Sequence, residues 1–247
     1  MKGQRLPGAP WFRAALQEHF PGARPEAVYV GDVYERLFDL GFDEHTAIAC
    51  VTTCRDELTQ PTVSKIQAAY GSAFNFSSLA GMLYIGQTGF GAAVGHAPRV
   101  EGKSRYVFFV LPHIGLDENG QVGVCRRQGQ DQTSKACGAL VALCQELTQG
   151  PPDLSLDPND LEQSLLRRAL VPQLAADGAK DLITLTRLAL RTILRDLEAL
   201  IAANLEPHHH DYAVVTGLLV HGPDDRDFVM PDVSYAVVDG TRRNVEL

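Results

Sequence analysis

Three residues with metal-binding side chains, Cys54, His113 and Cys137, are the part of this sequence best suited to chemistry. Each lies where a predicted strand or helix begins or ends. Two thiolates and one imidazole are a typical zinc ligand set, and three protein ligands leave a fourth position for water, as in catalytic zinc sites. Asp56, two residues after the first cysteine, adds a carboxylate beside that position. The pattern therefore predicts an open zinc site with a neighbouring hydrogen-bond acceptor.

Each candidate ligand also has a purely structural interpretation. The three residues lie far apart in the sequence, and no CxxC or HxxH pair makes the site local. A cysteine after a strand is often a small buried core residue, and His113 could simply bond a backbone carbonyl. Spacing alone leaves both interpretations open.

The elements that must position these residues are two buried strands and a helix. Residues 46–53 are short and rich in β-branched residues, which favours a strand, and Cys54 follows directly. Residues 105–111 form a second strand, which Pro112 ends just before His113. Open α/β sheets bind ligands at the carboxyl ends of their strands, where both side chains would lie. Cys137 is predicted to open a helix that runs to about residue 147.

The remaining pattern predicts an α/β fold with a mostly parallel sheet, as a single domain over residues 1–247. A helical insertion near 150–204 is expected to form a lid or a dimer surface. Further predicted elements are helices at 11–19, 160–175 and 180–204, a helix capped by Asp32, and strands at 212–220 and 233–238 around a turn at 222–225.

Composition narrows the class of protein. The chain has 247 residues, 45% hydrophobic and 21% charged, which is ordinary for a globular protein with a sizeable core. Its formal charge of −8 argues against a nucleic-acid partner. No apolar run reaches the roughly 18 residues of a membrane span, and no signal peptide is evident. Five cysteines without a disulfide spacing favour reduced thiols, so we expect a cytoplasmic protein without a membrane partner.

Several motifs, in the same order, resemble one family over roughly residues 15–240. They are Phe20-Pro21-Gly22-Ala23, Cys54-x-Asp56-Glu57, the glycine-rich segment 81–96, Pro112-His113-Ile114-Gly115, Cys137-Gly138, and the closing segment 211–217 with His221-Gly222-Pro223. Together they resemble the low-CO2-inducible protein B/C family, which has a β-carbonic-anhydrase-like fold and is sometimes called the theta class. The resemblance implies a homodimeric zinc enzyme that reversibly hydrates CO2 to bicarbonate and a proton by zinc-bound hydroxide. It also implies Cys54, His113 and Cys137 as ligands and Asp56 as the catalytic carboxylate.

One departure concerns the arginine that orients this aspartate. β-Carbonic anhydrases carry a Cys-x-Asp-x-Arg motif, whereas this sequence has Leu58 at the arginine position. Arg24 and Arg55 are the available replacements. Adjacent side chains on an extended segment point to opposite faces, which counts against Arg55 as the partner of Asp56. We therefore predict Arg24 as the second catalytic residue.

Other residues have weaker assignments. Phe74, Phe76 and Phe90 are predicted to wall a narrow CO2 pocket, and Gly86, Gly89, Gly91 and Gly95 to pack backbone around it, with plain turns or phosphate binding as alternatives. His19 and His96 are candidate proton shuttles, although a structural or surface role is the simpler reading of either. Residues 208–210, three histidines, are interpreted as a solvated loop, and Glu57 either supports the site or is an ordinary surface charge.

Competing functions remain open at this stage. Because the arginine is missing from position 58, a second hypothesis stays open. In it the protein holds zinc without catalysing a reaction, and it binds CO2 or bicarbonate or serves as a scaffold. A zinc hydrolase is a third possibility, but this sequence contains no HExxH or deaminase signature. A cysteine nucleophile at Cys54 lacks a recognisable partner pattern.

Overall fold

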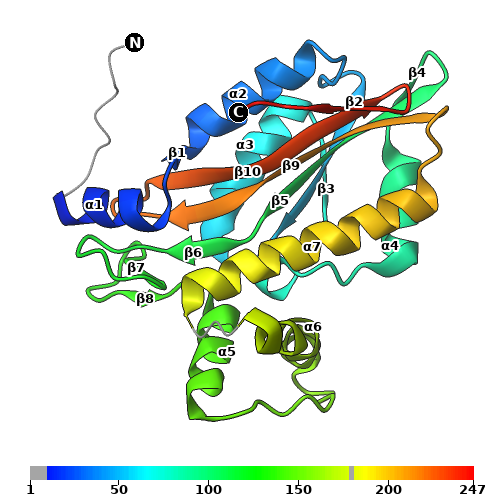
Figure 1. The fold of residues 1–247 in the computed structure, drawn as a ribbon. Helices are drawn as coiled ribbons and strands as arrows, with labels where there is room; N and C mark the ends of the chain where they lie inside the picture. The colour runs from blue at the N-terminus through cyan, green and yellow to red at the C-terminus, as the bar shows by residue number, and fades with distance from the viewer. Residues whose placement is uncertain (1–9, 178–180) are drawn as a thin grey trace.

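The computed structural model describes residues 10–177 and 181–247, and its centre is a nine-stranded sheet (Figure 1). The strand order is β1-β10-β9-β5-β2-β3. In addition, β4 pairs with β5, β6 with β9, and β11 with β10. A separate two-stranded ribbon joins β7 (Val124–Cys125) to β8 (Ser134–Lys135).

The middle of the sheet is parallel. It consists of β9 (His210–His221), β5 (Lys103–Leu111), β2 (Ala47–Thr53) and β3 (Ala73–Asn75). Every residue of β2 is buried, as expected for a strand covered on both faces. The prediction of two central strands, one ending at Cys54 and one before His113, is therefore confirmed.

Four further strands pair antiparallel to their neighbours. They are β10 (Asp227–Val238) with its neighbours β1 (Arg24–Pro25) and β11 (Thr241–Asn244), and β4 (Arg99–Val100), which folds back on β5. A short strand, β6 (His113–Gly115), continues beyond Pro112 and runs parallel to the second half of β9. The α/β prediction is confirmed, and the sheet is mixed, with a parallel centre.

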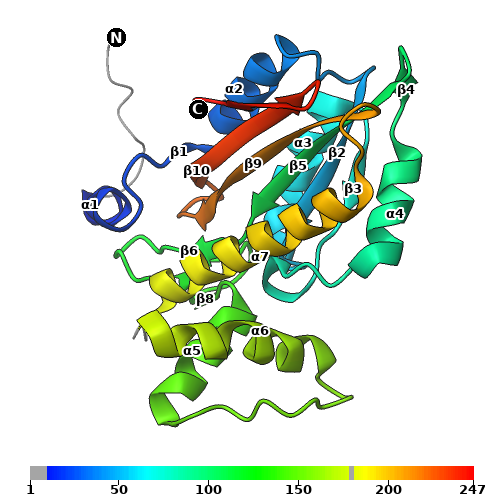
Figure 2. The same cartoon turned by 45° about the vertical axis from the view of Figure 1, so that its right-hand side comes forward.

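Helices cover both faces of the sheet (Figures 1 and 2). One face packs α2 (Glu26–Phe38) and α3 (Gln60–Tyr70), and the other packs α4 (Gly86–His96) and α7 (Leu182–Asn204). The rest are α1 (Pro10–His19), α5 (Gly138–Gln149), α6 (Leu161–Asp177) and two short 3-10 turns at Glu57–Thr59 and Leu79–Gly81. No helix of these described residues has the length and apolar character needed to cross a membrane.

Two predicted helices differ from those observed. The predicted 180–204 helix is α7, which lies along the sheet and buries Leu185, Ala189, Ile193 and Leu197 in the core. Its apolar face is thus used inside this chain, while the expectation of a lid or dimer surface near 150–204 stays a prediction. Residue 180 lies outside the described residues. Asp32 caps nothing, because α2 already begins at Glu26.

Candidate metal centre

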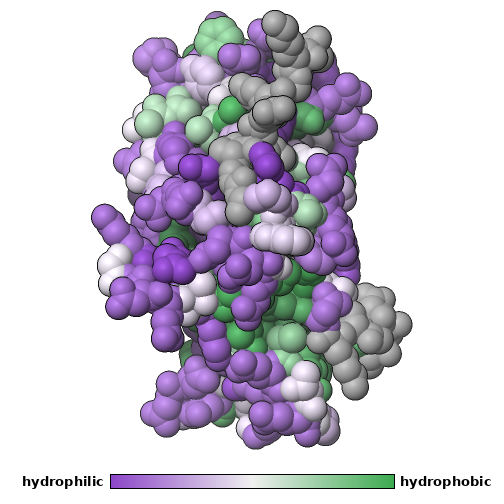
Figure 3. All heavy atoms as spheres, turned by 90° about the vertical axis from the view of Figure 1, so that its left-hand side faces the viewer, coloured by the Kyte–Doolittle hydropathy of each residue, from purple (hydrophilic) through white to green (hydrophobic). Residues whose placement is uncertain are grey.

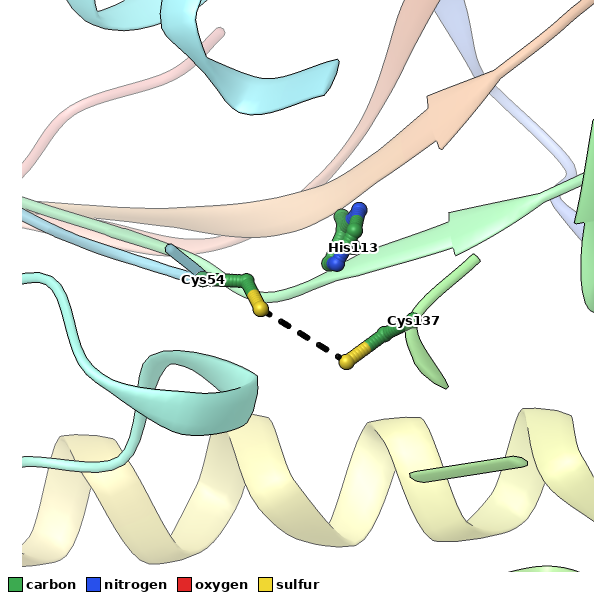
Figure 4. Close-up of side chains that lie close together, drawn as sticks. All are labelled: Cys54, His113 and Cys137. Carbon is green, nitrogen blue, oxygen red and sulfur yellow. Dashed lines mark hydrogen bonds between the residues drawn. The ribbon is translucent and has the colours of Figure 1, made fainter. Parts of the chain in front are cut away.

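The fold brings the three candidate ligands together from distant parts of the chain. Cys54 follows β2, His113 opens β6, and Cys137 is the N-cap residue of α5. One ligand atom of each lies within 4.8 Å of the others, and all three residues are buried. Figure 4 shows their side chains pointing into a common space. No other such cluster of His, Cys, Asp or Glu occurs among the residues that the structure describes.

The donor atoms are arranged as a metal would need them. The two Sγ atoms are 3.7 Å apart and share a hydrogen bond, which lowers the pKa of the Cys54 thiol to about 4 and, with burial, raises that of Cys137. Nε2 of His113 is buried without any hydrogen-bond partner. An unpaired buried nitrogen is costly unless something binds it. Two sulfurs and one imidazole nitrogen are the donors that zinc prefers, so the residues present fit this ion.

Asp56 lies beside the three ligands without joining them. One of its oxygens is 3.9 Å from Nε2 of His113, and its side chain is 11% exposed. Its Oδ1 also accepts a hydrogen bond from the backbone N–H of Leu58 and so caps the 3-10 turn Glu57–Thr59. Burial raises the pKa of Asp56, while His113 and the arginine described next act in the opposite direction. A carboxylate is therefore fixed at the edge of the three-ligand cluster.

The arginine that holds Asp56 is Arg127. Its Nη2 lies 3.1 Å from both carboxylate oxygens, and its Nε donates to Glu57. Two further hydrogen bonds orient the guanidinium, to Oγ of Ser134 at 2.6 Å and to the carbonyl of Lys135 at 2.9 Å. The bond from Arg127 also lowers the pKa of Glu57 to about 2.

The prediction that Arg24 pairs with Asp56 is therefore wrong in this structure. Arg24 lies in the edge strand β1, and its Nη1 bonds Asp32 on the next helix at 2.8 Å. Arg55, the other candidate, bonds Glu162 on α6 at 2.5 Å.

His221 and Asp227 extend from His113 in a row of hydrogen bonds. Nδ1 of His113 is 2.9 Å from Nε2 of His221, and Nδ1 of His221 is 2.8 Å from Oδ1 of Asp227. Both histidines are buried, and burial lowers the pKa of His221. Sequence reasoning assigned no role to His221 or Asp227. The available signal was a histidine at the end of the predicted 212–220 strand, the same position that marked Cys54 and His113.

The remaining predicted residues have simple environments. Gly86, Gly89, Gly91 and Gly95 all lie in α4, and the close backbone packing predicted for them is wrong, because a Cβ at Gly89 would meet only the Ile85 side chain and a Cβ at the other three would meet nothing within 4 Å. Gly81 does pack against the backbone before the first ligand, since a Cβ there would lie 3.2 Å from the Thr53 carbonyl carbon. Phe76 and Phe90 are fully buried in the same core cluster as Cys54 and Cys137, with ring centroids 6.1 Å apart. A role for Phe74, Phe76 and Phe90 in a CO2 pocket stays a prediction, as do the candidate shuttles His19 and His96. His96 packs on Phe74, and residues 208–210 form a turn into β9.

A cavity of about 720 Å³ opens on the outer side of this centre. Its lining includes Glu57, Arg127, His221 and Asp227, whereas none of the three candidate ligands lines it. The cavity therefore adjoins residues that support the centre, while Cys54, His113 and Cys137 are buried and do not line it.

Comparison with known proteins gives this centre a context. The family model described as limiting CO2-inducible proteins B/C beta carbonic anhydrases matches residues 23–239. The chain belongs to this family. The match spans the three candidate ligands, His221 and Arg127.

Solved structures support the same assignment. The crystal structure of limiting CO2-inducible protein LCIB matches with a TM-score of 0.77 and 33% identity, covering 94% of this chain and 97% of that chain. The crystal structure of PtLCIB4, a homolog of LCIB, matches with a TM-score of 0.83 and 26% identity, covering 95% of this chain and 100% of that chain. A search of curated proteins found no match. The chain is thus related to carbonic anhydrases in family and in fold.

Proposed function

We propose that this protein is a carbonic anhydrase, a lyase that reversibly hydrates CO2 to bicarbonate and a proton. The proposed metal is zinc, held by Cys54, His113 and Cys137. One observation carries the proposal. The unpartnered Nε2 of His113 and the two Sγ atoms face one another beside a carboxylate that an arginine holds.

The residues around the ligands have distinct tasks in this proposal. Zinc, when bound, supplies the Lewis acidity that makes water a nucleophile near neutral pH. Asp56 accepts a hydrogen bond from the attacking water and so directs its lone pair toward CO2. Arg127 binds both oxygens of Asp56, which would keep this carboxylate from coordinating the metal itself. Buried apolar residues of the core cluster on this side of the sheet suit a small apolar substrate.

The catalytic proposal is favoured over the non-catalytic one by Arg127. The absence of an arginine at position 58 was the sequence feature that kept a binding or scaffold protein open. Arg127 reaches the same carboxylate from the loop after β7, with two contacts of 3.1 Å. The aspartate–arginine pair is thus present although the sequence motif is not.

A homodimer and a cytoplasmic location complete the proposal. Figure 3 shows an apolar area in the middle of the face that carries α1 and the β7–β8 ribbon. Trp11 of α1 is 72% exposed, so a second copy packing on this face would cover it. A reducing compartment suits a centre that needs two thiolates, and none of the five cysteines, all of them described residues, forms a disulfide. Light scattering tests the dimer, and Trp11→Glu should lower the measured mass to that of one chain.

Stopped-flow CO2 hydration on protein of measured zinc content tests the function. We expect about one zinc per chain and hydration activity in the wild type, with zinc and activity both lost in Cys54→Ala. Asp56→Asn should keep zinc and lose most activity. Cys50→Ala is the matched control, because Cys50 is a buried cysteine of the same strand that lies outside the cluster. Wild-type protein that binds zinc and hydrates no CO2 would overturn the enzyme proposal in favour of a binding or scaffold role.

A further inference from the structure

A continuous hydrogen-bonded row links the metal-facing histidine to a carboxylate. The row runs from Asp227 to His221 at 2.8 Å and from His221 to His113 at 2.9 Å. The side chains of His113 and His221 are 0% and 3% exposed, and that of Asp227 is 13% exposed. The two rings meet edge to face, with planes at 78°. Nothing in the proposed function requires His221 or Asp227 to touch metal or substrate.

The carboxylate determines where each proton of the row lies. An ionised carboxylate only accepts hydrogen bonds, so Nδ1 of His221 must carry a hydrogen and donate it to Asp227. A neutral imidazole has one N–H, which leaves Nε2 of His221 as an acceptor. Nδ1 of His113 must then be the donor of the second bond. The remaining nitrogen, Nε2 of His113, is left with a free lone pair, and this is the buried atom without a partner.

We propose that His221 and Asp227 are positioning residues that fix the tautomer and ring orientation of His113 for metal binding. The proposal rests on the metal site of the proposed function and is independent of CO2 hydration. Groups that orient a metal-binding histidine through its second nitrogen typically change metal affinity by 10- to 100-fold when they are removed.

Three neighbouring strands build the row through their register. His221 and Asp227 are directly opposite each other in the antiparallel pair of β9 and β10. In the parallel pair of β6 and β9, His113 is opposite Leu219, so His221 is two residues further along β9. Residues two apart on a strand share a face of the sheet, which places both rings on the same side.

The turn between β9 and β10 keeps this register. Gly222 donates its N–H to the Arg226 carbonyl at 2.8 Å. A Cβ at Gly222 would lie 2.8 Å from that same oxygen and 2.8 Å from the ring of Phe12. The close approach of the two strands beside His221 therefore depends on the missing side chain.

Zinc affinity, measured by competition with a chelating dye, tests the proposal. We expect His221→Leu to bind zinc 10- to 100-fold more weakly than the wild type, because the Nδ1–H of His113 loses its acceptor. His221→Gln should recover most of the affinity, since its amide oxygen can accept the same bond. Asp227→Ala should weaken binding less than His221→Leu, because His221 remains but its tautomer is free.

Two controls separate positioning from simple destabilisation. Thr216 lies on β9, the strand that carries His221, and its hydroxyl donates to the Val233 carbonyl of β10. Thr216→Val removes this bond and should lower stability without changing zinc affinity. Imidazole nitrogen chemical shifts of the metal-free wild type should place the His113 proton on Nδ1. A proton found on Nε2 would overturn the proposal, as would His221→Leu with zinc affinity within twofold of the wild type. Wild-type protein that binds no zinc would instead refute the proposed function, while the nitrogen shifts would still test the row.

Discussion

Replacement of Arg127 by alanine should remove most of the hydration activity, whereas replacement of Arg24 should leave it nearly unchanged. The structure gives these two arginines different partners. Arg127 holds Asp56 through two contacts of 3.1 Å, and Arg24 holds Asp32 at 2.8 Å on the outer surface. The two variants thus separate the pairing in the fold from the pairing that sequence proximity suggested.

The size of the effect follows from burial. The Arg127 and Asp56 side chains are 18% and 11% exposed. Removing one partner of a buried ion pair costs about 3–5 kcal/mol, and because this pair is partly exposed we take the lower end, about 3 kcal/mol. At about 1.4 kcal/mol per tenfold, a loss of that size in the transition state is roughly 100-fold in kcat/KM. Arg24 and Asp32 are 28% and 39% exposed, and an exposed pair is worth about 0.2–1 kcal/mol.

Stopped-flow hydration and zinc content, measured on the same samples, give the result. Arg127→Ala should retain zinc, because none of the three candidate ligands bonds Arg127, and should lose about 100-fold in kcat/KM. The kcat/KM of Arg127→Lys should lie between those of the wild type and Arg127→Ala, since an ammonium keeps the charge but cannot make the paired contact. Wild-type activity in Arg127→Ala, together with loss of activity in Arg24→Ala, would refute the assignment of Arg127.

Three further predictions concern stability. Gly115→Ala should lower the free energy of unfolding in urea by about 1–3 kcal/mol, because its Cβ would lie 2.6 Å from the Val124 carbonyl oxygen. The control is Gly91→Ala in α4, where a Cβ meets open space, and it should raise the free energy of unfolding by about 0.5–1 kcal/mol. Asp181→Ala should cost about 1 kcal/mol at pH 7 by removing the N-cap of α7. Partial burial acts to raise the pKa of Asp181, but the hydrogen bonds from Thr184 prevail, so the pKa is lowered. The stabilisation by this cap is therefore fully present above the ordinary pKa of an aspartate, and it is lost as the pH falls through the lowered pKa of Asp181. Excess chelator should lower the melting temperature of the wild type and not of Cys54→Ala, since free zinc at 1,000 times its Kd contributes about 4 kcal/mol.

One outcome would contradict each of these three stability predictions. Equal stability of the two glycine variants would contradict the close packing of β6 against β7. A difference between wild type and Asp181→Ala that grows toward acid pH would contradict a lowered pKa. A chelator-insensitive melting temperature would contradict a zinc site that is coupled to folding.

The sequence predicts the central strands well because their signal is local. Residues 46–53 and 105–111 are apolar and β-branched, and the structure places strands there within two residues. A cysteine or histidine directly after such a strand is therefore placed at one sheet edge by the strand itself. The helix after Cys137 follows in the same way, from Gly138 to Gln149.

The supporting residues were missed because they depend on tertiary contacts. Arg127 comes from the loop between the two strands of the β7–β8 ribbon, which no periodic pattern marks. The choice of Arg24 and Arg55 relied on closeness to a motif in sequence, whereas a guanidinium on a long side chain can reach its partner from any neighbouring segment. Asp32 and Glu162, the actual partners of those two arginines, carried no signal that they would compete for them.

Strand register, rather than loop conformation, controls the chemistry of His113. The first half of β9 pairs with β5 and its second half with β6, so one strand continues past Pro112 and orders the residues on both sides of it. A slip of one residue between β9 and β10 would turn Asp227 to the opposite face from His221, because side chains alternate along a strand. His113 would then lose the carboxylate that ultimately fixes its proton. The antiparallel edge of the sheet is thus as much a part of the metal centre as the parallel strand ends that the sequence indicates.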